Sequence, residues 1–273
     1  MLEFLKAILF GIVEGITEWL PISSTGHMIL LNEFVKLDVS AEFWEMFLVV
    51  IQLGAIAAVV ILFWKKIFPF RFDKKPVIQK DIFEMWFKVL VACVPAAVVG
   101  VFFDDILEKY LYNYVTVSIA LIVFGIAFLI IENKNKGKKA KINKISKITY
   151  QTAALIGVFQ LIAAIFPGTS RSGATIVGAL LIGVSKTVAA EFTFFLAIPV
   201  MLGASLLKVL KFGLAFTPTE LGILFTGMVV AFVVSVFVIK FLMDYIKKND
   251  FKVFGWYRIV LGVLVLVYFG FIG

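Results

Sequence analysis

The 273-residue chain is 62% hydrophobic and 16% charged, with a mean hydropathy of +1.05. These values exclude an ordinary soluble domain and, with apolar runs along the whole length, predict an all-α polytopic membrane protein. A net charge of +8 would suggest nucleic acid in a soluble chain, but these lysines cluster in loops between apolar segments and indicate membrane topology and anionic lipid contacts. The single cysteine, Cys93, excludes an intramolecular disulfide. The N-terminus lacks a basic segment and a cleavage site, so no signal peptide removal is expected.

The chain begins with an apolar run over residues 4–20, which is shorter than the ~20 residues that cross a bilayer. Pro21 and a Ser-Ser-Thr-Gly turn separate it from a second short run that ends near Val35. We expect a re-entrant helix-loop-helix hairpin, because non-helical backbone at membrane depth is tolerated beside protein or a wet cavity. A second such hairpin is expected over 150–185.

Three transmembrane helices are predicted after each hairpin. Pro95 and Pro199 are expected to kink their helices. The expected spans are about 43–64, 83–103 and 115–131 in the first half, and about 188–209, 221–243 and 254–271 in the second.

The two halves of the chain are approximate copies of each other. Because a hairpin returns to its own side and three spans cross an odd number of times, the repeat is predicted to have inverted topology. The prediction is one integral membrane domain over 1–273, with repeats at about 1–132 and 150–273 and a basic cytoplasmic linker at 133–149. With Pro21 placed on Pro167, the matches are Gly11 with Gly157, Glu14 with Gln160, and Ser23-Ser24 with Thr169-Ser170, while Gly54-Ala55 matches Gly203-Ala204 at a slightly larger offset.

Basic residues are concentrated on one predicted face, with sixteen lysines and arginines there against five on the other. By the positive-inside rule the first face is cytoplasmic, so the first hairpin enters from outside and the second from the cytoplasm. The two tips are then expected to meet near the midplane. The sixteen are Lys65, Lys66, Arg71, Lys74, Lys75, Lys80, Lys134, Lys136, Lys138, Lys139, Lys141, Lys144, Lys147, Lys247, Lys248 and Lys252, and the five are Lys6, Lys36, Lys109, Lys208 and Lys211.

Glu14 and Glu18 lie within the apolar sequence of the first hairpin, where a charged side chain costs roughly 2.5–3.5 kcal/mol on insertion scales. Four residues apart, they share one face of a helix. Two carboxylates, phosphate oxygens and water suit Mg²⁺ or Ca²⁺, which prefer oxygen ligands, so both acids are predicted metal ligands. In the alternative, one acid pairs with Arg171 and the other faces water.

Small hydroxyl residues follow each proline, where the next helix is expected to begin, and such residues are N-cap types. Each new helix would direct free N–H groups and its positive dipole end at the midplane, which forms an anion site. Arg171, predicted to be catalytic, adds a planar fork suited to phosphate oxygens. Ordinary capping explains any single hydroxyl, but their joint occurrence beside acids favours a substrate site. The predicted substrate-binding residues are Ser23, Thr25, Gly168, Thr169, Ser170, Ser172 and Thr175.

The only histidine, His27, follows Ser24 by three residues and is expected within reach of its hydroxyl. It suits a general base, a nucleophile or a general acid. We favour Ser24 as nucleophile with His27 as its base and Glu18 as a further catalytic group. Attack by His27 itself or by water stays open.

These motifs resemble those of the undecaprenyl-diphosphate phosphatases of the bacitracin-resistance type. That family is marked by Glu-x-x-x-Glu followed by Pro-x-Ser-Ser-Thr-Gly-His, and by Pro-Gly-x-Ser-Arg-Ser-x-x-Thr. The chain carries both motifs without departure, from Glu14 to His27 and from Pro167 to Thr175. The resemblance covers the whole chain and implies catalytic or binding roles for Glu14, Glu18, Ser23, Ser24, His27, Ser170 and Arg171.

The resemblance implies removal of the terminal phosphate from undecaprenyl diphosphate, which recycles the lipid carrier for peptidoglycan synthesis and confers bacitracin resistance. It further implies a divalent metal, Mg²⁺ or Ca²⁺, and a multi-pass protein of the bacterial inner membrane whose site faces the extracytoplasmic side. The expected partners are the polyprenyl diphosphate substrate and membrane lipids, with no nucleic acid, and homodimer formation stays open. The alternative function is a transporter or flippase of a phosphorylated polyprenyl lipid, because inverted repeats with broken helices are a transporter plan.

Overall fold

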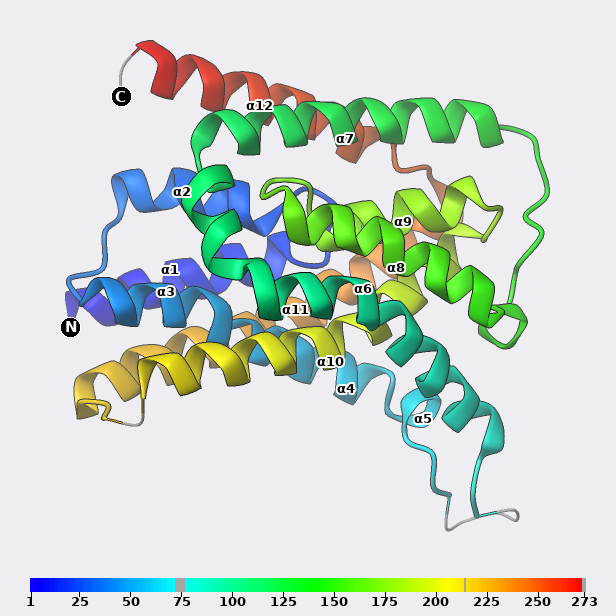
Figure 1. Cartoon of the computed structure of the whole chain (residues 1–273), viewed down its shortest axis with the longest axis horizontal. Coiled ribbons are helices and arrows are strands. Elements are labelled where there is room, and N and C mark those ends of the chain that lie inside the picture. Colours follow the sequence, from blue (N-terminus) through cyan, green and yellow to red (C-terminus); the bar gives the residue numbers. More distant parts are fainter. Residues whose placement is uncertain (72–76, 214, 272–273) are drawn as a thin grey trace.

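The computed structural model describes residues 1–71, 77–213 and 215–271, and within them the chain is built of helices with two isolated β-bridges (Figure 1). Lys74 and Lys75 lie outside the described residues. Six helices of the described part are long and apolar enough to cross a membrane, which confirms the all-α polytopic fold. They cover Ala41–Leu62, Lys80–Phe103, Tyr114–Asn135, Lys186–Phe212, Pro218–Lys248 and Lys252–Phe271.

Both predicted hairpins are present. The first consists of α1 (Leu2–Thr17) and α2 (Ser24–Phe34), and the second of α8 (Tyr150–Ile165) and α9 (Arg171–Leu181). They enter from opposite ends of the molecule, and their turns lie near its middle (Figure 1). That is the arrangement an inverted repeat requires, although the repeat itself stays a prediction.

The turns of the two hairpins differ by one residue. Ser23 caps α2 and Ser170 caps α9, so the residue equivalent to Ser23 is Ser170. The match of Ser23 with Thr169 is therefore wrong by one position. The second tip holds an additional residue between its proline and its cap, and Gly168 there adopts a φ of +89°.

The first predicted span, 43–64, is interrupted at one residue. The structure covers Ala41–Leu62 as α3 (Ala41–Val50) and α4 (Gln52–Leu62), which meet at Ile51, a turn residue with a helical φ of −60° and ψ of −24°. The short α5 (Trp64–Ile67) comes after them. The Ser205 hydroxyl donates to the Val49 carbonyl at 3.3 Å, which satisfies a backbone oxygen beside the break. The break places Gln52 at the start of a helix in the middle of the protein.

Two of the remaining helices contain an internal proline, and both continue past it as helix. Pro95 lies inside α6 and Pro199 inside α10. The first half of α10 is enclosed by other helices, with Phe192, Phe194 and Phe195 each at most 1% exposed. The helices are α6 (Lys80–Leu111), α7 (Tyr114–Asn135), α10 (Lys186–Phe212), α11 (Pro218–Lys248) and α12 (Lys252–Phe271), with a 3₁₀ turn at Ile145–Lys147.

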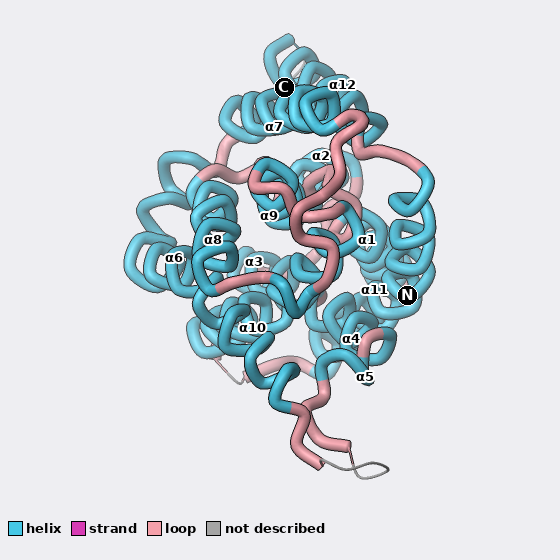
Figure 2. Tube along the Cα trace, turned by 90° about the vertical axis from the view of Figure 1, so that its right-hand side faces the viewer, coloured by secondary structure: helices cyan, strands magenta, loops and turns pink. Residues whose placement is uncertain are grey.

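Each half of the chain packs its first helix on a helix of the other half, and the two halves do so in the same way. α1 packs on α11 as α8 packs on α6, and α7 packs on α12 (Figure 2). A Cβ on Gly11 would lie 2.6 Å from the Gly227 carbonyl oxygen, and a Cβ on the matching Gly157 would lie 2.5 Å from that of Ala92. The two glycines therefore have the same role, because each lets its hairpin approach the partner helix closely.

Candidate active site

A cavity of about 160 Å³ lies between the two hairpin tips. The break between α3 and α4 and the middle of α10 complete its wall. Both ionic and hydroxyl groups from the two tips face it, so the structure brings together side chains that are far apart in the sequence. The lining residues are Glu18, Ser24, Thr25, Gln52, Ala163, Pro167, Gly168, Ser170, Arg171, Val200, Met201 and Ala204.

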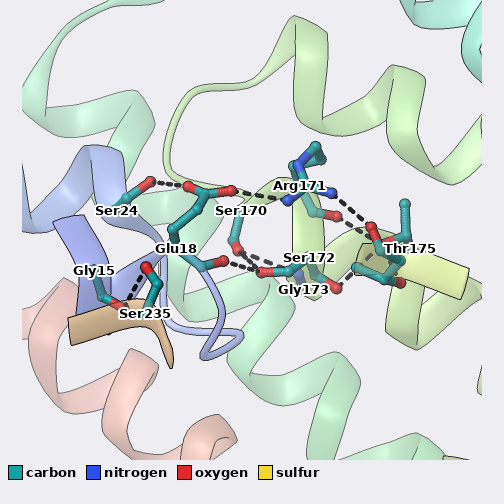
Figure 3. A network of polar contacts seen from close by, with 10 residues as sticks. Gly15, Glu18, Ser24, Ser170, Arg171, Ser172, Gly173, Thr175 and Ser235 are labelled. Atoms are coloured by element: carbon teal, nitrogen blue, oxygen red, sulfur yellow. Dashed lines mark hydrogen bonds and ion pairs between the residues drawn. The ribbon is translucent and has the colours of Figure 1, made fainter. Parts of the chain in front are cut away.

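Glu18 is the centre of the polar network at this cavity (Figure 3). Its Oε1 accepts from the Arg171 guanidinium at 2.9 Å, and its Oε2 accepts from the Ser24 hydroxyl at 2.9 Å. The carboxylate is 6% exposed and the arginine side chain 12% exposed, so water screens this ion pair weakly. One carboxylate thus joins the first residue of α2 to the first residue of α9.

Each tip turns through a conformation that is uncommon for a residue other than glycine. Ser23 has a φ of +74° and Ser170 a φ of +69°. Their hydroxyls accept from the Gly26 and Gly173 amides at 3.4 and 3.1 Å, as N-caps do. Two helix N-termini therefore begin at the cavity, where their dipoles favour a bound anion.

Four of the predicted substrate-binding residues lie outside the cavity lining. Ser23 caps α2, and the Ser172 hydroxyl donates to the Glu18 carbonyl oxygen at 3.1 Å, which fixes one tip to the other. The Thr175 hydroxyl donates to the Arg171 carbonyl oxygen at 2.9 Å. Thr169 is fully buried. Thr25, Gly168 and Ser170 line the cavity, and their role in substrate binding stays a prediction.

His27 is not the partner of Ser24. Its Nδ1 lies 2.7 Å from the Ser23 carbonyl oxygen and its Nε2 lies 2.7 Å from the Tyr257 hydroxyl, with the two rings stacked. Because both ring nitrogens are engaged and the Ser24 hydroxyl donates to Glu18, the expected pairing of Ser24 with His27 is wrong.

Glu14 lies one helical turn before Glu18, with the Glu18 amide donating to the Glu14 carbonyl oxygen at 3.0 Å. Its side chain is 1% exposed, and its Oε1 has no hydrogen-bond partner among the described residues. A buried acceptor without a partner is costly, so this oxygen fits a metal ligand. The described residues contain no group of three or more His, Cys, Asp or Glu that could hold a metal ion. Any metal would therefore need phosphate and water oxygens to complete its coordination.

The sequence interpretation missed three polar residues of this region. Gln52 lines the cavity, and the Thr193 carbonyl accepts from Arg171 at 3.0 Å. Arg258, on α12, is fully buried and bonds the backbone of both tips. Each lies inside a predicted span, where a polar or charged residue is itself a signal of function. Arg258 carried the strongest such signal.

A family model described as bacitracin resistance protein BacA matches residues 7–264. An undecaprenyl-diphosphatase of Desulfitobacterium hafniense is 68% identical over 269 residues, which is 98% of this chain and 97% of that protein. Undecaprenyl-diphosphatase 1 of Clostridium acetobutylicum is 66% identical over 268 residues, 98% of each chain. An undecaprenyl-diphosphatase of Enterococcus faecalis is 63% identical over 268 residues, 97% of each chain.

Proposed function

The chain belongs to the bacitracin resistance protein BacA family, and we propose that it hydrolyses undecaprenyl diphosphate to undecaprenyl phosphate and inorganic phosphate. The reaction returns the lipid carrier to peptidoglycan synthesis and confers bacitracin resistance. The observation that carries the proposal is the Ser24–Glu18–Arg171 network at the meeting point of two helix N-termini. It combines a nucleophile, an acceptor for its proton and a cation for phosphate oxygens.

In the proposed reaction, the Ser24 hydroxyl attacks the terminal phosphorus and passes its proton to Glu18, whose Oε2 already accepts that hydrogen bond. The bond from phosphorus to the bridging oxygen breaks, and undecaprenyl phosphate leaves. Water then attacks the phosphoserine, which releases phosphate and restores Ser24. Arg171 and the amides at the starts of α2 and α9 stabilise charge on the phosphoryl oxygens.

A divalent cation fits this site as a proposed cofactor. The two carboxylates Glu14 and Glu18 would hold it together with substrate oxygens and water, and Mg²⁺ and Ca²⁺ both accept such ligands. When bound, it would neutralise charge on the diphosphate. Binding requires Glu18 to share its oxygens among the cation, Ser24 and Arg171.

A second cavity of about 440 Å³ supports a route for the substrate, because it shares Thr25, Ala163 and Pro167 with the first. Its other wall residues are mostly apolar, with Glu45 and Lys208 as an ion pair of 4.0 Å. The apolar wall suits the first isoprene units of the lipid. Lys208 belongs to the face that the charge distribution predicts to be extracytoplasmic, so we place the opening on the outer side of the inner membrane.

The test is phosphate release by purified protein in detergent, with undecaprenyl diphosphate and no gradient or second compartment. A phosphatase releases phosphate under these conditions, whereas a transporter or flippase of the same lipid does not. If the wild-type protein releases no phosphate but moves the lipid across the bilayer of proteoliposomes, the transporter or flippase is favoured.

The proposed nucleophile is tested by trapping a phosphoenzyme with substrate labelled at its terminal phosphate. We expect the label on Ser24, and we expect it there in the His27→Ala variant as well, because His27 does not contact the Ser24 hydroxyl. The Ser24→Ala variant is the control and should carry no label. Label on His27, or rapid quenching that finds no phosphoenzyme at any time, would contradict attack by Ser24.

A further inference from the structure

Arg258 makes an unusual set of contacts for a buried arginine. It lies on α12 and is 0% exposed. Its guanidinium donates to carbonyl oxygens, and in the described part of the chain no carboxylate forms an ion pair with it. The five acceptors are Pro21 at 3.2 Å, Gly168 at 3.0 Å, Thr169 at 2.7 Å, Leu121 at 3.4 Å and Ala120 at 3.5 Å.

These acceptors belong to three separate parts of the protein. Pro21 is in the first tip, Gly168 and Thr169 are in the second, and the other two carbonyls belong to α7. A single planar group therefore connects both tips to one pair of packed helices, α7 and α12. Keeping a charge buried without an acid is expensive, so its retention calls for a function beyond stability.

The bonded carbonyls lie beside the strained positions of the tips. Gly168 itself has a φ of +89°, Thr169 precedes Ser170 at +69°, and Pro21 lies two residues before Ser23 at +74°. A residue other than glycine is strained in this region of φ, and the strain persists where surrounding contacts hold the backbone in place. Fixing these carbonyls fixes where Ser24 and Arg171, the next residues along, enter the cavity.

We propose that Arg258 is a positioning residue for the reaction, which holds the two tips in register so that Ser24 and Arg171 face one phosphate. It is absent from the cavity lining, so it acts through the backbone and touches no substrate. Lysine cannot replace it, because one ammonium lacks the planar fork that reaches acceptors on both tips. This inference builds on the proposed function by naming a residue that organises the same site.

The test compares Arg258→Lys with two controls. Arg71→Lys removes a partly exposed arginine that donates to the Lys65 carbonyl oxygen, and Glu132→Gln changes a buried acid that accepts from the Phe251 amide just before α12. Arg258→Lys should lower kcat about 100-fold with KM changed less than about threefold, since small misplacements of reacting groups have effects of that size. Arg71→Lys should match wild type, and Glu132→Gln should lower the Tm while kcat per folded molecule is kept.

A double-mutant cycle separates positioning from a general loss of stability. If Arg258 acts by placing Arg171, then Arg171→Lys should reduce kcat much less in the Arg258→Lys background than in wild type. Additive effects of the two substitutions would overturn the proposal. So would an Arg258→Lys variant that behaves like Glu132→Gln, with a lowered Tm and an unchanged kcat per folded molecule.

Hydrogen exchange of the tips needs no substrate, so it tests the positioning separately from the proposed function. Arg258→Lys should speed exchange at the amides of both tips, over about residues 22–27 and 168–174. Unchanged exchange at either tip would overturn the proposal even if activity fell.

For the case in which Arg258→Lys does not fold, Gly173→Ala is the second variant. Its Cβ would lie 3.0 Å from an Arg258 nitrogen, whereas that of Gly26→Ala, at the same capping position of α2, would meet Leu121 at 3.2 Å. Gly173→Ala should lower kcat at least about fivefold more than Gly26→Ala. Equal effects of the two variants would overturn the proposal.

Discussion

At the scale of single residues, the site depends on side chains that contact more than one partner. Arg171 donates to Glu18 through one nitrogen and to the Thr193 carbonyl through the other. The Thr193 hydroxyl lies 2.9 Å from that of Thr175, which in turn donates to the Arg171 carbonyl. The guanidinium is thus oriented before substrate arrives, which reduces the reorganisation needed in the transition state.

Arg171→Lys should lower kcat/KM on the order of 100-fold although the charge is kept. One ammonium cannot contact Glu18, the Thr193 carbonyl and two phosphate oxygens in the geometry of a fork. Phosphate release with undecaprenyl diphosphate measures the effect, and Arg71→Lys is the matched control. A lysine variant as active as wild type beside an inactive Arg171→Ala would reduce Arg171 to a counter-ion.

Activity should depend on a divalent cation through Glu14 and Glu18. Excess chelator should abolish phosphate release and added Mg²⁺ or Ca²⁺ should restore it, because the cation offsets negative charge between two carboxylates and a diphosphate. Glu14→Gln should raise the cation concentration needed for half-maximal activity at least about tenfold. Glu132→Gln, which alters a buried acid outside the cavity, should leave that concentration unchanged. Full wild-type activity in excess chelator contradicts the metal hypothesis.

Much of the site is readable from residue type and spacing, and the remainder depends on tertiary contacts. Glu18, Ser24 and Arg171 were predicted and they do meet at the cavity. The structure does not show the expected pairing of Ser24 with His27. Instead, the His27 Nε2 lies 2.7 Å from the hydroxyl of Tyr257, which is far away in the sequence. Spacing along a helix shows which residues share a face but not which neighbour packs against that face.

At the scale of helices, the hairpins and six spans follow from apolar run length, turn residues and capping residues. The break at Ile51 does not, because the sequence from Phe47 to Ala55 contains no proline and remains strongly apolar. It is supported from outside, where Ser205 on α10 satisfies the Val49 carbonyl. Helix interruptions that depend on such a partner are not visible in local sequence.

Gly54 and Gly203 match in the internal repeat but differ in the space around them, and this difference should affect stability. A Cβ on Gly54 would clash with the Met228 backbone of α11, whereas one on Gly203 would meet nothing within 4 Å. Gly54→Ala should destabilise the protein by about 1–3 kcal/mol, as overpacking does, and lower its Tm in detergent. Gly203→Ala is the matched control and should leave Tm unchanged or raise it, since alanine favours an exposed helix. Equal Tm values for both variants would contradict the close contact of α4 with α11.

At the scale of the whole molecule, the two hairpins enter from opposite ends and their turns lie near the middle (Figure 1). The 160 Å³ cavity is lined by residues of both turns. The adjoining 440 Å³ cavity is the proposed substrate route, so the end at which it opens decides the side from which substrate enters. Lys208 and Tyr112 line it. Lys208 lies near the predicted extracytoplasmic end of α10, and Tyr112 directly follows the predicted extracytoplasmic end of α6. Lys144 and Ser146 line a different cavity, on the predicted cytoplasmic face.

Cysteine labelling in intact cells should therefore find the site open to the outside. In a Cys93→Ala background, Thr25→Cys places a thiol where the two adjoining cavities share a wall, and a membrane-impermeant reagent should modify it. A non-hydrolysable prenyl diphosphate analogue should slow that modification, because its head group occupies the same space. Ser146→Cys is the matched control for the other face and should react only after the cells are permeabilised, as the positive-inside rule predicts for the lysine-rich linker around it. If Thr25→Cys reacts only in permeabilised cells, the cavity opens to the cytoplasm and the enzyme would act on newly made carrier. If both cysteines react in intact cells, the predicted orientation of the chain is wrong.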